Sequence, residues 1–125
     1  MAAPNIVGPT AITAKTSTLR GVTGATGTVV VNNAASSGKA IQLVSLYAAN
    51  IDGTAAVDVT FKLHDQDDGA GNGTAIASTV SVPADATVIV VDKNSPVWLE
   101  EDRSIVVTPS ASDDIEVVCS YLELS

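Results

Sequence analysis

The chain has 125 residues and a formal net charge of -8, from 14 acidic against 6 basic side chains. A chain of this length is one ordinary domain, long enough to bury a single core. Hydrophobic residues make up 46% of it and aromatic residues 3%, so it is too apolar to be disordered and its core must be aliphatic. An acidic surface repels a phosphate backbone, so we expect no direct binding of nucleic acid.

The chain contains one cysteine, Cys119, and one histidine, His64. A lone cysteine can form neither an internal disulfide nor a multi-cysteine zinc site, which fits folding in a reducing compartment. No stretch approaches the roughly 18 apolar residues of a membrane-spanning helix. Residues 1–5 lack the basic and apolar regions of a signal peptide. We therefore expect a soluble protein with no membrane partner that is not exported by an ordinary signal peptide.

The pattern of the chain changes near residue 28. Residues 1–27 are small and polar, rich in Thr, Ala and Gly, with weak alternation near Ala11 to Leu19. This region is predicted to be an extended N-terminal arm with one marginal strand. Residues 28–125 consist of short runs of Val, Ile, Leu and Thr that are cut by clusters of Gly, Asn, Asp and Ser. They are predicted to form one β-domain.

The β-domain is predicted to contain eight further strands, and no window has the period of a capped helix. The expected strands are 28–32, 39–49, 57–64, 74–82, 87–91, 97–99, 104–108 and 115–124. Alternation is cleanest in 57–64, where Val57, Val59, Phe61 and Leu63 are predicted to face the core. The apolar parity changes within 39–49, which indicates a bulge or a strand covered on both faces. The fold class is therefore all-β, a single antiparallel β-sandwich or jelly roll.

One acidic loop, 65–73, is a candidate calcium site. Carboxylates precede glycines that let the backbone curl, as an oxygen-only site requires. The candidate ligands are Asp65, Asp67, Asp68 and Asn72. The calcium-loop motif needs an oxygen ligand at its fifth position and Glu at its twelfth, where this chain has Gly69 and Ile76. We therefore predict a solvated hairpin loop, with calcium binding as the alternative, and no metal or cofactor.

No set of residues in the sequence completes a catalytic site. His64 precedes Asp65, but neighbouring side chains on a strand face opposite ways, and no nucleophile accompanies them. Cys119 is flanked by aliphatic residues, so we predict a buried thiol with a raised pKa. The acidic run 100–102 is predicted to be a solvated turn. We expect that the protein is not an enzyme.

Several segments resemble the small virion structural proteins of tailed bacteriophages, especially those of marine bacteria and cyanobacteria. These segments are 39–54, 76–87, 96–101 and 115–121. The resemblance covers residues 28–125 and rests on strand and turn patterns rather than on catalytic signatures. It implies a non-enzymatic component of the virion that is made in the host cytoplasm.

Within the virion, the resemblance favours a capsid decoration, or cement, protein on the outer head surface. Such a protein would bridge subunits of the major capsid protein, as a homo-oligomer and by preference a trimer, with its arm laid over neighbours. The alternative is a tail, neck or fibre-attachment component. A carbohydrate-binding module is disfavoured, because Trp98 and two tyrosines make a poor platform for a sugar.

Overall fold

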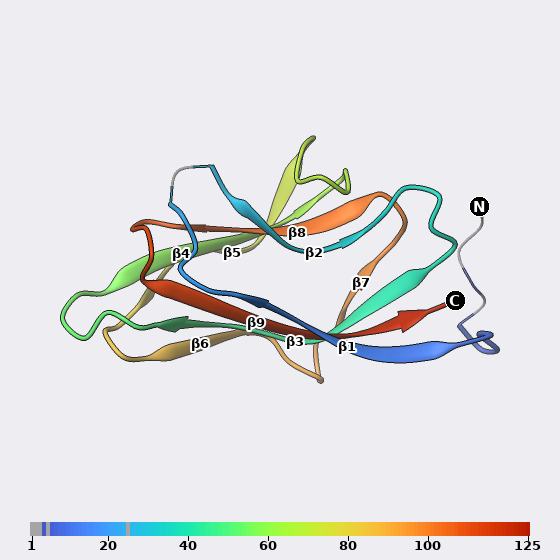
Figure 1. The fold of residues 1–125 in the computed structure, drawn as a ribbon, viewed down its shortest axis with the longest axis horizontal. Helices are drawn as coiled ribbons and strands as arrows, with labels where there is room; N and C mark the ends of the chain where they lie inside the picture. Colours follow the sequence, from blue (N-terminus) through green and yellow to red (C-terminus); the bar gives the residue numbers. More distant parts are fainter. Residues whose placement is uncertain (1–3, 5, 25) are drawn as a thin grey trace.

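The computed structural model describes residues 4, 6–24 and 26–125, and in these residues it contains no helix and nine strands. Two antiparallel sheets pack face to face, as the two layers of Figure 1 show. The strands are β1 (Ile12–Leu19), β2 (Thr28–Asn33), β3 (Ala40–Asn50), β4 (Val57–His64), β5 (Gly73–Val82), β6 (Thr87–Val91), β7 (Val97–Leu99), β8 (Arg103–Pro109) and β9 (Ile115–Leu124). The predicted all-β sandwich is confirmed.

Each sheet is built around a strand from late in the chain. The five-stranded sheet has the order β1-β9-β3-β6, with β7 also paired to β3. The four-stranded sheet has the order β2-β8-β4-β5. Because the neighbours are distant in sequence, most contacts of the fold are long-range, as expected for a sandwich.

A bulge in β3 explains the change of parity in its sequence. The register of β3 against β9 shifts between Leu43 and Ser45, so one extra residue enters the strand. Leu43 and Leu46 are consequently both buried, although they stand at opposite parity along the chain. Of the two interpretations that the sequence allowed, the bulge is confirmed.

The core between the sheets is aliphatic, with one aromatic side chain in it. The largest fully buried side chains are Phe61, Ile41, Leu43, Leu46, Leu99, Ile105 and Ile115. Val57, Val59 and Phe61 are at most 2% exposed, and Leu63 is partly buried against the same cluster. The predicted inward face of β4 is therefore confirmed.

The N-terminal region contains a strand where the sequence predicts a marginal one, near Ala11 to Leu19. Strand β1 pairs with β9 along its whole length, from Ile12 opposite Leu124 to Leu19 opposite Val117. The Ser17 hydroxyl also donates a 2.6 Å hydrogen bond to the carbonyl of Val30 in the other sheet. Threonines on a mostly exposed edge strand give only weak alternation, so its pairing shows poorly in the sequence. The predicted arm residues 1–3, 5 and 25 lie outside the described residues.

Two buried asparagines close the sandwich. Asn50, the last residue of β3, donates from Nδ2 to the carbonyls of Ala55 (2.9 Å) and Val82 (3.0 Å). Asn33, the last residue of β2, donates from Nδ2 to the carbonyls of Lys39 (2.9 Å) and Leu99 (3.1 Å). In each case one acceptor belongs to the opposite sheet. Sequence reasoning read these asparagines as turn residues and missed this role.

Replacing Phe61 with Ala should destabilise the domain by about 3–5 kcal/mol, because it removes a fully buried ring from an aliphatic core. Urea denaturation of the purified chain measures the change. The matched control is Ile89→Ala at a side chain that is 67% exposed, where we expect a change within about 0.5 kcal/mol. A loss below about 1 kcal/mol for Phe61→Ala would show that the ring does not anchor the core.

Candidate functional site

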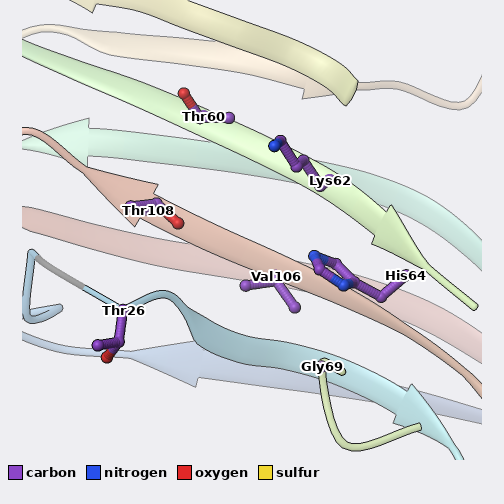
Figure 2. Close-up of a pocket in the computed structure, with 7 residues that line it drawn as sticks. All are labelled: Thr26, Thr60, Lys62, His64, Gly69, Val106 and Thr108. Atoms are coloured by element: carbon purple, nitrogen blue, oxygen red, sulfur yellow. The ribbon is translucent and has the colours of Figure 1, made fainter. Parts of the chain in front are cut away.

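The outer surface of the four-stranded sheet carries a shallow hollow of about 350 Å³. Figure 2 shows that side chains of two neighbouring strands, β4 and β8, line most of it, and that two loop residues complete it. The lining residues are Thr60, Lys62 and His64 of β4, Val106 and Thr108 of β8, and Thr26 and Gly69. The hollow thus combines three hydroxyls, an amine and an imidazole over an aliphatic floor.

The β4–β5 loop, residues 65–72, is tied to the sheet beside this hollow. The Ser104 hydroxyl donates to the carbonyl of Gln66 (2.7 Å), and the Asp67 amide donates to the Asp102 carboxylate (3.0 Å). His64 Nδ1 lies 3.2 Å from the carbonyl oxygen of Ala70. A carbonyl oxygen only accepts, so this bond places a hydrogen on Nδ1. The loop is therefore part of the folded surface rather than a free hairpin tip.

Two glycines allow the loops to approach the floor of the hollow. Gly27 and Gly69 have φ of +80° and +82°, which disfavours any residue with a side chain. A Cβ at Gly27 would lie 2.7 Å from Val106 Cγ1, and one at Gly69 would lie 3.2 Å from Val106 Cγ2. This close approach explains why Val106, which shares the outer face with Lys62, is only 7% exposed.

Lys62 differs from most of the basic side chains in its surroundings. Lys15, Arg20 and Lys39 form ion pairs, and Arg103 donates to backbone carbonyls. Within the described part of the chain, Lys62 and Lys93 form no ion pair and no side-chain hydrogen bond. The hollow thus holds an uncompensated ammonium, and none of its lining residues is acidic.

The three carboxylates among the candidate calcium ligands accept hydrogen bonds from backbone amides, two within the loop and one in the β2–β3 turn. Asp65 Oδ1 accepts from the Asn72 amide (2.9 Å), Asp68 Oδ1 from the Ala70 amide (3.0 Å), and Asp67 Oδ2 from the Ala35 amide (3.1 Å). No cluster of His, Cys, Asp or Glu suited to a metal ion occurs among the described residues. These carboxylates order the loop and join it to the β2–β3 turn.

The acidic run 100–102 forms the turn between β7 and β8. Asp102 has φ of 60° and its carboxylate holds the amide of Asp67, which the sequence did not reveal. Glu100 is exposed, whereas Glu101 and Asp102 are partly buried. The run is therefore only in part the solvated turn that the sequence predicts.

A second surface is the outer face of the five-stranded sheet. Residues directly opposite in an antiparallel sheet share a face, so the register gives two continuous rows across it. This five-stranded face consists of Trp98, Gln42, Leu122 and Ala14 in one row, Ile89, Tyr47, Val118 and Thr18 in the other, and Ser45, Ser120 and Thr16 between them. Ile89 is 67% and Trp98 40% exposed. None of these residues is charged, and in the next row Glu116 is paired with Arg20 (3.6 Å).

Two lysines converge on one carboxylate near the C-terminal end of β9. Lys39 Nζ lies 2.8 Å from Glu123 Oε1, and Lys15 Nζ lies 3.3 Å from Oε2. The hydrogen bond from Lys39 is the main cause of a pKa for Glu123 below its usual value, and Lys15 contributes to it. The cluster joins β1, β9 and the residue that precedes β3, and it belongs to the framework of the sheet.

Comparison with known proteins shows the fold and no family. The chain matches no protein-family model, and no curated protein matches its sequence. Its structure is similar to a chain of the Bacillus endospore appendages, which form a novel family of disulfide-linked pili, with a TM-score of 0.53, 15% identity, and coverage of 91% of this chain and 88% of that chain. At this identity the likeness concerns the fold alone.

Chains from two strains of infectious bursal disease virus are less similar. The Gt-strain chain has a TM-score of 0.40 at 11% identity, and the alignment covers 93% of this chain but 33% of that one. For the Gx strain the TM-score is 0.34, with 42% of that chain covered. Neither likeness bears on function. Among the described residues, no helix has the length and apolar character needed to cross a membrane.

Cys119 is fully buried in β9, and burial raises the pKa of its thiol to about 12. We predict that the native protein does not react with a thiol reagent between pH 7 and pH 9, because the thiolate is the reactive form. One equivalent should react after denaturation in urea. With an aromatic disulfide as the reagent, the absorbance of the aromatic thiolate that it releases measures the extent of the reaction. Rapid labelling of the native protein would contradict the buried position.

The stability contributed by Glu123 should depend on pH. Because the pKa of Glu123 is lowered in the folded state, its carboxylate stabilises the protein at pH values above the usual glutamate pKa. This contribution is lost as the pH falls through the lowered pKa. Glu123→Gln should therefore destabilise at pH 7 and lose its effect in acid. We expect no more than about 1 kcal/mol, because the lysines are 40% and 44% exposed and solvent screens them. Urea titrations across pH test this, with Glu100→Gln as the control without such partners.

Proposed function

We propose that this chain is a non-enzymatic structural protein of a phage virion, a capsid decoration protein that binds the outer head surface through its five-stranded face. The observation that carries this proposal is the absence of charge from that face in a chain with a net charge of -8. Centres of protein interfaces are depleted of charged residues and enriched in aromatic ones. Trp98 and Tyr47 lie within the rows described above.

The size of the face supports an oligomer on the lattice. The sheet is four strands wide, about 19 Å, and β9 extends about 17 Å from Val118 to Leu122, so the uncharged face covers about 300 Å². A stable interface typically buries about 800 Å² on each partner. One copy would bind the major capsid protein weakly, whereas a trimer would combine three such contacts. This comparison favours an oligomer, and we propose that it is a trimer that bridges neighbouring capsid subunits.

Assembly through this face would be non-covalent. The endospore appendages of similar fold are described as disulfide-linked, whereas this chain has one cysteine, which is fully buried in the middle of β9. A disulfide through Cys119 would require β9 to leave the sheet. Burial of apolar surface at the face would instead supply the free energy of attachment.

Introducing a charge into the face should abolish attachment. Ile89→Asp would bury an unpaired carboxylate at the interface, so we expect at least about a tenfold loss of affinity for capsids that lack the protein. Cosedimentation with such capsids measures binding. Ser78→Asp on β5 places the same charge on an exposed residue of the other sheet and should bind normally. Both variants should keep their stability within about 0.5 kcal/mol.

The function itself is tested with particles that lack the protein. They should lose their DNA at lower temperature or under milder osmotic shock, and purified protein should restore resistance. Ile89→Asp protein should fail to restore it. If the particles keep full capsid stability but lose tail attachment or host adsorption, the protein is instead a tail, neck or fibre component.

A further inference from the structure

The hollow on the four-stranded sheet brings several hydrogen-bond donors together, and no acidic side chain is among its lining residues. Lys62 contributes an ammonium group with three donors. Among the described residues, the hydroxyls of Thr26 and Thr108 have no hydrogen-bond partner, and the Thr60 hydroxyl accepts from the Thr79 amide (3.0 Å), which leaves its own hydrogen to donate. The hollow therefore offers up to six hydrogens to a ligand, three from the ammonium group and one from each hydroxyl.

We propose that the hollow is a binding site for a small oxyanion, a carboxylate or phosphate group, held by the Lys62 ammonium and by the hydroxyls of Thr26, Thr60 and Thr108. This site lies on the sheet opposite the five-stranded face and does not depend on the proposed function. An oxyanion presents acceptors on every side, so it satisfies this set of donors, and bonds to a charged group are about twice as strong as neutral ones.

The negative charge of the protein does not prevent this. Charges more than about 10 Å apart are largely screened at 0.1 M salt, so the immediate surroundings determine the potential. Asp65 and Asp68 of the adjoining loop direct a carboxylate oxygen to amides of their own loop at 2.9 Å and 3.0 Å. Asp58 lies two residues before Thr60 on the same face of β4. None of these three residues belongs to the lining of the hollow. Lys62 therefore faces the ligand position without a competing carboxylate.

The site is already formed before a ligand binds. The loop beside it is fixed to β8 by the Ser104 hydroxyl and to β4 by the His64 ring. Lys62 and Thr60 lie on the same strand face, and Thr108 is directly opposite Thr60 in the sheet. Binding then loses little conformational entropy apart from the lysine side chain. A hollow of about 350 Å³ is at the small end of ligand pockets and suits an ion with a few waters.

The full chain can be titrated with inorganic phosphate, and separately with succinate, while sodium chloride keeps the ionic strength constant. Amide resonances in ¹H–¹⁵N spectra report binding at Thr60, Lys62, Gly69 and Thr108. We expect saturable shifts confined to these residues, with a dissociation constant on the order of 1 mM. Saturation by phosphate alone identifies a phosphate group as the ligand, and saturation by succinate identifies a carboxylate.

Two variants and a matched control test the named donors. Lys62→Gln should weaken binding at least about tenfold, and Thr108→Val, which removes a hydroxyl at nearly constant shape, several-fold. Lys93→Gln removes the same charge from the other lysine without a partner and should change the affinity less than about twofold. The proposal is overturned if neither anion gives saturable shifts, or if Lys62→Gln and Lys93→Gln have equal effects. Unchanged resonances in the core establish that each variant is folded.

Discussion

Two buried carboxamides, one at the end of a strand in each sheet, determine how the layers of the sandwich lie on one another. Asn33 and Asn50 are each 2% exposed, and each donates to a backbone carbonyl of the opposite sheet. A buried amide without its partner would cost about 1–3 kcal/mol, so sliding of the sheets is penalised at both sites. The aliphatic core alone would resist separation of the layers but would specify their register less strongly.

The hollow depends on the same framework. The carbonyl of Asn33 accepts from the Asp102 amide (2.8 Å), and the Asp102 carboxylate in turn holds the Asp67 amide of the β4–β5 loop. The loop that borders the hollow is thus connected through two hydrogen bonds to a residue that joins the sheets. The carboxylates that resemble metal ligands in the sequence hold the backbone of the β4–β5 loop in place beside β8.

The strands could be predicted because the alternation of apolar and polar residues that marks each one is local in the sequence. Four strands have the predicted bounds, namely β4, β6, β7 and β9. Alternation and the flanking turn residues determine the first and the last residue of each. The position of β1 in the sheet could not be predicted, because it depends on β9, about a hundred residues away. The hollow was missed for the same reason. Lys62, Val106 and Gly69 carry no shared motif, and only the pairing of β4 with β8 and the fold of the loop bring them together.

The position of β9 has a consequence for synthesis on the ribosome. β9 lies between β1 and β3, and neither of those strands pairs with the other in the finished sheet. The five-stranded sheet therefore cannot close until residues through Leu124 have been translated and have left the exit tunnel. Until then the edges of β1 and β3 are open to pairing with other nascent chains. Closure of the five-stranded sheet is thus a later step than pairing of β2, β8, β4 and β5, and pairing between nascent chains on one polysome is the misassembly to which it is exposed.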